Sequence, residues 1–128
     1  MSISALKQLR FVAVGQNDPL AAPLLTQLAA EYAKRYRGDV DKILAWLLSY
    51  PAEEFAPPGG GVLIGVLDGQ PVTGGAFRRF DRATAELKRI WTDTTHRRHG
   101  HARTLLVALE EEIIARGYRR IYLTTGDR

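Results

Sequence analysis

Residues 85–103, AELKRIWTDTTHRRHGHAR, decide the fold of this chain. Their first part, 85–93, is rich in apolar and β-branched residues and predicts a β-strand. A short basic loop and Gly100 follow, and apolar residues then recur at helical spacing over 102–115. The first amides of such a helix lack internal acceptors, and its dipole favours negative charge at that end. The segment therefore predicts an anion site between the strand and the helix.

Much of the positive charge gathers in this loop. The chain has 18 Lys and Arg against 14 Asp and Glu, a formal net charge of +4, and 96–103 holds all three histidines. The helical stretch after the loop instead carries Glu110, Glu111 and Glu112. A nucleic-acid surface would spread basic residues along a face, so we expect no nucleic-acid partner. The compact cluster points to a small polyanion, and its arginines suit phosphate.

The remaining sequence predicts an α+β domain. Strands are expected over 9–14, 62–67, 72–80, 85–93 and 121–124, and helices from Asp18 or Pro19 to Gly38, from Asp39 or Asp41 to Pro51, and over 102–115. Asp68-Gly69 predicts a hairpin turn, and 52–61 predicts a loop. The order β-α-α-β-β-β-α-β predicts a mostly antiparallel sheet that ends in a βαβ unit with two parallel strands. We expect one domain over 1–128.

Composition excludes several classes of protein. With no cysteine, the chain has no disulfide, no catalytic thiolate and no cysteine-ligated metal. No apolar run approaches the roughly 18 residues of a membrane span, so no membrane partner is expected. Residues 1–10 lack the basic-then-apolar pattern of an export signal. These features predict a cytoplasmic protein.

Residues 97–102, RRHGHA, match the pattern R/Q-x-x-G-x-G/A of the pyrophosphate loop in GNAT (GCN5-related) N-acetyltransferases. The strand before the hexamer and the amphipathic helix after it make the match specific. The segments EFAPPGGGVLIGVLDGQPV, AELKRIW, HRRHGHARTLLVALE and GYRRIYLTTG also resemble successive parts of a bacterial small-molecule-type subgroup. The resemblance covers 9–128 and implies the acyl-CoA N-acyltransferase fold.

The resemblance implies acetyl-CoA as co-substrate and a coenzyme site on the strand end and loop. Its cofactor-binding residues would be Ile90, Trp91, Thr92, Arg97, Arg98, His99, Gly100, His101, Ala102 and Arg103. The loop amides would hold the pyrophosphate, and Gly100 would let it approach the backbone closely. The strand end would run beside the pantetheine arm, and the amide near Thr92 would polarise the thioester carbonyl.

Direct attack on the thioester needs a neutral amine, so a base, often acting through water, has to remove a proton. By the resemblance, Glu86 stands at the spacing from Gly100 of the glutamate that serves as base in histone-type members. Burial near Trp91 would raise the pKa of this carboxyl toward neutrality. Two alternatives stay open: a structural carboxylate paired with Lys88 or Arg78, and a group that orients the substrate amine.

No metal site is expected, because the loop histidines have no carboxylate or cysteine partner and a bound cation would oppose anion binding. Tyr32 and Tyr36 on the first helix are interpreted as core residues or as walls of an acceptor pocket. Substrate contact by Tyr32, Tyr36 or Trp46 is the alternative.

Family members continue beyond the strand that ends near Thr125 with a helix and two further strands. We therefore expect a C-terminally truncated domain, with impaired activity and a homodimer that covers the exposed edge. Two functions stay open: an N-acetyltransferase acting on a small-molecule or peptide amine, and a non-catalytic acyl-CoA-binding module or degenerate GNAT remnant. Aminoglycoside, polyamine, amino acid and protein N-terminus all remain candidate acceptors.

Overall fold

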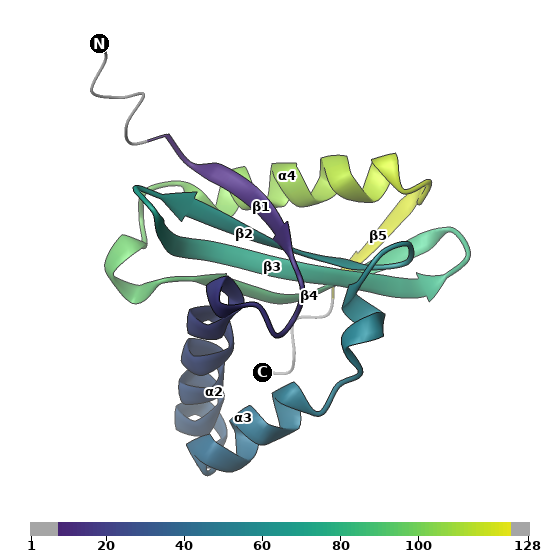
Figure 1. The fold of residues 1–128 in the computed structure, drawn as a ribbon. Coiled ribbons are helices and arrows are strands. Elements are labelled where there is room, and N and C mark those ends of the chain that lie inside the picture. The colour runs from purple at the N-terminus through teal and green to yellow at the C-terminus, as the bar shows by residue number, and fades with distance from the viewer. Residues whose placement is uncertain (1–7, 124–128) are drawn as a thin grey trace.

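A computed structural model describes residues 8–123 (Figure 1). The strands are β1 (Arg10–Val14), β2 (Gly61–Leu67), β3 (Gln70–Asp81), β4 (Thr84–Thr92) and β5 (Arg120–Leu123), and the helices are α2 (Ala22–Tyr36), α3 (Val40–Leu48) and α4 (His101–Ala115). Short 3-10 helices occupy η1 (Pro19–Ala21), η2 (Ala52–Phe55) and η3 (Thr94–His96). The predicted order of strands and helices is confirmed. Thr124, the predicted end of the last strand, lies outside the described residues.

The strands form one sheet in the order β1-β2-β3-β4-β5. Neighbours are antiparallel from β1 to β4, whereas β4 and β5 are parallel. Both features agree with the fold class expected from the sequence. At the β2–β3 hairpin Asp68 and Gly69 take φ angles of 52° and 80°, the conformation that this turn requires.

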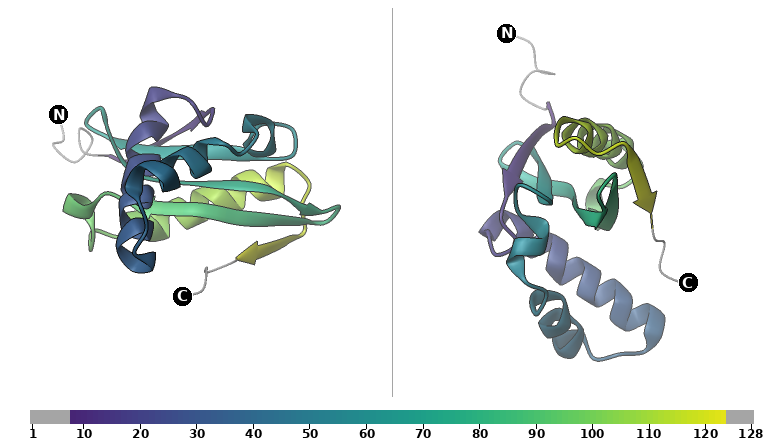
Figure 2. Two further views of the ribbon diagram at one scale, coloured as in Figure 1. Left: turned by 90° about the horizontal axis from the view of Figure 1, so that it is seen from below. Right: turned by 90° about the vertical axis from the view of Figure 1, so that its right-hand side faces the viewer.

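Helices cover both faces of the sheet, with α4 on one face and α2 and α3 on the other (Figures 1 and 2). Alternate residues of β2 serve the two layers, because successive strand side chains point to opposite faces. Val62 and Ile64 join the core on the α2 side, while Leu63 joins the core under α4. The site described below lies at one end of this three-layer arrangement.

Local sequence explains two departures from the expected boundaries. The helix start predicted at Asp18 is present, since its Oδ1 accepts from the Leu20 amide at 2.9 Å, but the first turn is the 3-10 helix η1. The prediction of a loop over 52–61 is wrong at its start, where η2 forms. Phe55, only 1% exposed, is buried at the end of η2, so core packing orders this segment.

A β-bulge interrupts β4. Ala76 pairs with Lys88 and Gly74 with Trp91, so β4 carries one residue more than β3 across this step. Arg89 sits in the bulge with φ 57°. The parallel partner β5 pairs only with the first part of β4, over 84–87. Within the described residues, the part of β4 beyond the bulge therefore has one edge without a strand partner.

None of the helices in the described part of the chain has the length and apolar character needed to cross a membrane.

Candidate active site

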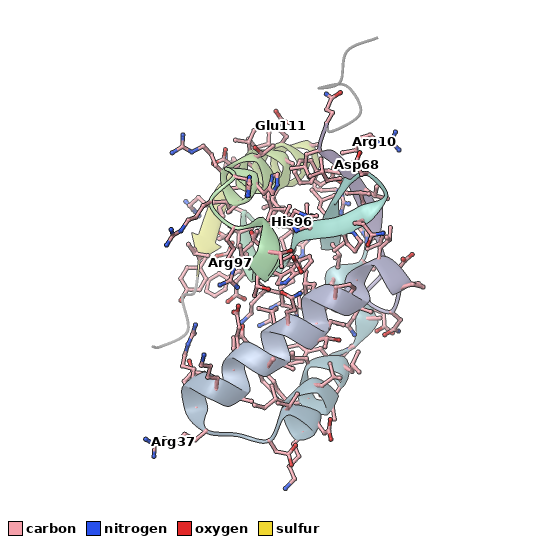
Figure 3. All side chains as sticks on the ribbon, turned by 90° about the vertical axis from the view of Figure 1, so that its left-hand side faces the viewer. Arg10, Arg37, Asp68, His96, Arg97 and Glu111 are labelled. Carbon is pink, nitrogen blue, oxygen red and sulfur yellow. The ribbon has the colours of Figure 1, made fainter. Side chains whose placement is uncertain are left out.

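The loop between β4 and α4 lies at one end of the sheet, between α4 and α2; Figure 3 looks onto this end and labels His96 and Arg97. A pocket of about 580 Å³ opens there. Its lining residues are Ile90, Trp91, Thr92, His96, Arg97, Arg98, Gly100, His101, Ala102 and Arg103. The structure thus brings together every cofactor-binding residue expected from the sequence except His99.

The three histidines of the loop differ in position. His99 is exposed and stacks on the His101 ring with centroids 5.7 Å apart, outside the pocket lining. His96 lines the pocket although it was missing from the expected residues; its place at the start of HRRHGHAR was the available signal. Burial lowers the pKa of His101, and the neighbouring His99 and His96 lower it further. Across 8–123, no three metal-ligating side chains are grouped to hold a metal ion.

The backbone opens the start of α4 toward the pocket. Arg98 and Gly100 take left-handed conformations, with φ angles of 69° and 79°. No side chain caps the helix, so the amides of its first turn are left for a ligand or solvent. A Cβ added at Gly100 would meet nothing within 4 Å, so a ligand can approach this backbone without a steric barrier.

A chain of hydrogen bonds fixes the loop to the rest of the fold. Asp93 Oδ1 accepts from Gln27 Nε2 at 2.6 Å, while Oδ2 accepts from the Thr95 amide at 3.1 Å and lies 2.9 Å from His96 Nδ1. Gln27 Oε1 in turn accepts from Trp91 Nε1 at 2.9 Å. Hydrogen bonds from Thr95, His96 and Gln27 hold the pKa of Asp93 well below its usual range. The loop geometry is therefore set before any ligand binds.

Arg97 links the loop to both β4 and α2. Its Nε donates to the Thr92 carbonyl at 3.2 Å, and its guanidinium forms an ion pair with Glu31. The Thr92 carbonyl therefore points away from β3. In an extended strand the amide of a residue points the same way as its carbonyl, so the Thr92 amide faces the open edge. This is the amide that the sequence resemblance assigns to the thioester carbonyl.

A second cavity of about 620 Å³ lies between α2, α3 and β4. Its lining residues are Leu28, Glu31, Tyr32, Arg35, Tyr36, Ile43, Trp46, Leu87, Lys88, Arg89, Ile90 and Leu123. Tyr32 and Tyr36, interpreted from sequence as core or pocket wall, line it, as does Trp46, which was considered for substrate contact. Ile90 lines this cavity and the loop pocket, so the two spaces adjoin along β4.

Arg89 holds the bulge of β4 in place. Its guanidinium donates to Gln16 Oε1 at 2.8 Å and to the Leu47 carbonyl at 2.7 Å. It also lies over the rings of Phe55 and Tyr50, with 4.7 Å and 5.1 Å to their centroids. Burial lowers the pKa of Arg89. The hydrogen bonds and ring contacts compensate the guanidinium for its loss of water. The sequence analysis missed this residue, whose role depends on partners distant along the chain.

Glu86 is buried on β4, with 9% of its side chain exposed. Arg78 Nε lies 3.1 Å from its Oε1 and Lys88 Nζ lies 3.6 Å from its Oε2. Arg78 and Lys88 are the two partners that the sequence analysis named for a purely structural role of Glu86. Glu86 lines a third pocket, of about 570 Å³, with η2 and β5 residues rather than the cavity beside α2. Lys88, which lines that cavity, connects Glu86 with it.

Comparison with solved structures supports the fold. An acyl-CoA N-acyltransferase, so described, from Klebsiella pneumoniae is 20% identical, with a TM-score of 0.68 over 91% of this chain and 70% of that chain. An aminoglycoside acetyltransferase from an uncultured soil metagenomic sample is 20% identical, with a TM-score of 0.64 over 94% and 82%. An aminoglycoside N-acetyltransferase solved with CoA is 15% identical, with a TM-score of 0.60 over 94% and 78%.

A search of the curated proteins found no match. The family model described as the acetyltransferase (GNAT) family matches residues 24–128, which include both cavities and the loop that connects β4 with α4. This chain belongs to the acetyltransferase (GNAT) family.

Proposed function

We propose that this protein is an acetyl-CoA-dependent N-acetyltransferase that passes the acetyl group directly to an amine. The observation that carries the proposal is the pocket at the start of α4, lined by the loop arginines and open to the first helical amides. Family membership and a similar structure that contains CoA support the same co-substrate. The pocket chemistry suits a pyrophosphate.

The coenzyme would lie along β4 from the loop toward the second cavity. The amides from 98 to 103 would bind its pyrophosphate together with Arg98 and Arg103, and the open edge of β4 would bind the pantetheine amides. Ile90, which lines both spaces, would lie beside the arm. The Thr92 amide would donate to the thioester oxygen as it gains negative charge.

The acceptor amine would enter the cavity between α2, α3 and β4. Its nitrogen attacks the thioester carbon, the carbon–sulfur bond breaks, and the coenzyme leaves as a thiolate that takes up a proton. We propose Glu86 as the base that accepts the amine proton through water, since it lies on β4 and its neighbour Lys88, 3.6 Å away, lines the acceptor cavity. The ion pairs of Glu86 with Arg78 and Lys88 fit the structural alternative equally well.

Coenzyme binding is tested by calorimetric titration with acetyl-CoA and dephospho-CoA. We expect micromolar binding of acetyl-CoA, weakened about tenfold in Arg98→Gln and in Arg103→Gln through loss of a charged hydrogen bond. Arg82→Gln, an exposed arginine in the β3–β4 turn, is the matched control and should bind as the parent does. Folded protein without detectable binding, or an equal loss in Arg82→Gln, would contradict the coenzyme site.

Catalysis is tested separately with Glu86→Gln and a panel of amines. We expect the variant to keep its affinity for acetyl-CoA and to lose at least about tenfold in kcat. The ion pairs of Glu86 favour a second candidate, a non-catalytic acyl-CoA-binding module. Tight coenzyme binding without transfer to any amine would establish that module instead.

We also propose that copies of the chain associate through β5. Among the described residues β5 pairs with β4 alone, and its apolar side chains are exposed. Phe80 of β3 packs on Tyr122 with ring centroids 4.7 Å apart and extends the same apolar surface. An exposed strand edge with apolar neighbours favours pairing with a second copy.

A further inference from the structure

The cavity between α2, α3 and β4 has an uneven charge. Its described lining holds three cations, Arg35, Lys88 and Arg89, and a single carboxylate, Glu31. That carboxylate forms an ion pair with Arg97 of the neighbouring loop, which neutralises it. A ligand inside the cavity therefore meets a net positive surface.

The three cations differ in the partners that they already have within the protein. Lys88 lies 3.6 Å from Glu86, and Arg89 donates to the neutral oxygens of Gln16 and Leu47. Arg35 forms no ion pair with a carboxylate among residues 8–123; it lies over the Tyr36 ring, at 5.9 Å to its centroid, and interacts electrostatically with Tyr32. Its planar guanidinium can bind both oxygens of a carboxylate. Arg35 is therefore the cation most available to an anionic group.

The remaining walls are apolar and aromatic. Leu28, Ile43 and Ile90 provide aliphatic surface, and Tyr32 and Trp46 provide rings. Burial raises the pKa of the Tyr32 hydroxyl, so it keeps its proton at neutral pH and remains a hydrogen-bond donor. The walls thus suit an apolar body with an anionic end.

We propose that the acceptor is an α-amino acid with an apolar side chain, its carboxylate bound by Arg35 and its side chain packed against the aromatic wall. This inference rests on the proposed acetyltransferase function. Lys88 keeps further N–H donors beyond its contact with Glu86 and would assist Arg35. The positive surroundings would also disfavour the ammonium form of the bound amine, which leaves the nitrogen free to attack.

The same charges argue against polycationic acceptors. Aminoglycosides and polyamines carry several ammonium groups, each of which would meet cations rather than carboxylates in this lining. The similar structures of aminoglycoside acetyltransferases share the fold with this chain at 20% identity or less. Fold alone does not transfer their substrates.

The test measures acetyl transfer by the full chain as release of CoA thiol. L-Phenylalanine and phenethylamine form a matched pair that differs only in the carboxylate, and spermidine and sisomicin represent polycations. We expect kcat/KM for phenylalanine to exceed that for phenethylamine by at least about tenfold, the worth of a charged hydrogen bond. In Arg35→Gln this ratio should fall about tenfold through phenylalanine alone. Lys34→Gln, the exposed neighbour on α2 outside the lining, should keep the ratio.

The outcomes separate the inference from the proposed function. Preference for phenethylamine, spermidine or sisomicin overturns the inference and leaves the acetyltransferase intact. If no amine reacts, phenylalanine and phenethylamine are titrated calorimetrically into CoA-saturated protein; absent or non-selective binding of phenylalanine overturns the inference. Selective binding that is lost in Arg35→Gln supports the site even where transfer has failed. A folded chain that binds no acetyl-CoA overturns the function and the inference built on it.

Discussion

Gly100 combines a left-handed backbone with open space around it. Its φ is 79°, and an added Cβ would meet no atom within 4 Å, so only backbone strain opposes a side chain here. We expect Gly100→Ala to lower the free energy of unfolding by about 1 kcal/mol. Gly15→Ala is the matched control, because Gly15 has the same open space without a positive φ. Urea denaturation should find the control unchanged or slightly more stable; equal losses in both variants would contradict the strain.

His101 makes stability depend on pH. Burial and the neighbouring histidines lower its pKa in the folded protein below the ordinary value of 6.5. Near and below pH 6.5 the unfolded chain therefore binds more protons at His101 than the folded protein does. The contribution of His101 to the free energy of unfolding is greatest above pH 6.5 and falls as the pH drops below it. We expect His101→Asn to lose less stability than the parent between about pH 8 and pH 5.5 in urea denaturation. Parallel pH curves for the two proteins would rule this contribution out.

At the scale of elements, Arg89 joins three segments at the bulge of β4. Removing its guanidinium in Arg89→Met leaves the Leu47 carbonyl and Gln16 Oε1 without their donor. We expect a loss of about 2–4 kcal/mol in the free energy of unfolding, measured with urea. Arg89→Lys should recover only part of it, since one ammonium replaces the planar fork. Arg82→Met controls for the loss of charge, and a comparable loss there would refute the account.

The elements themselves were predictable because each depends on neighbouring residues. Apolar spacing placed the helices, and Asp68-Gly69 placed the hairpin. The expected coenzyme residues came from one short stretch of the sequence, 90–103, and all but His99 line one pocket. The cavity lining and the bulge depend instead on distant partners. Arg89 donates a hydrogen bond to Gln16, 73 positions away in the sequence, and no local sequence pattern predicts such a contact.

Across the whole molecule, the two cores occupy opposite faces of the sheet and the apolar side chains of β5 remain outside both. Ile121, Tyr122 and Leu123 are 37%, 43% and 53% exposed. We expect light scattering after size-exclusion chromatography to find a dimer that Tyr122→Lys converts to a monomer. Val107→Lys, on the exposed face of α4, should stay dimeric. A parent chain that is monomeric at all concentrations would contradict association through β5.

Gln27 links α2 to β4 and to the loop that follows it, and few other side chains can make both of its contacts. Its amide must accept from Trp91 and donate to Asp93 at once, at 2.9 Å and 2.6 Å. Glutamate would keep the size but set a carboxylate against that of Asp93, while asparagine is a methylene too short to keep both contacts. In a saturation library selected for thermal resistance, position 27 should tolerate fewer replacements than its partly buried surroundings alone would suggest. A deep mutational profile of α2 would then show position 27 to be as intolerant as the buried core positions Leu24 and Leu28, although Gln27 is only partly buried.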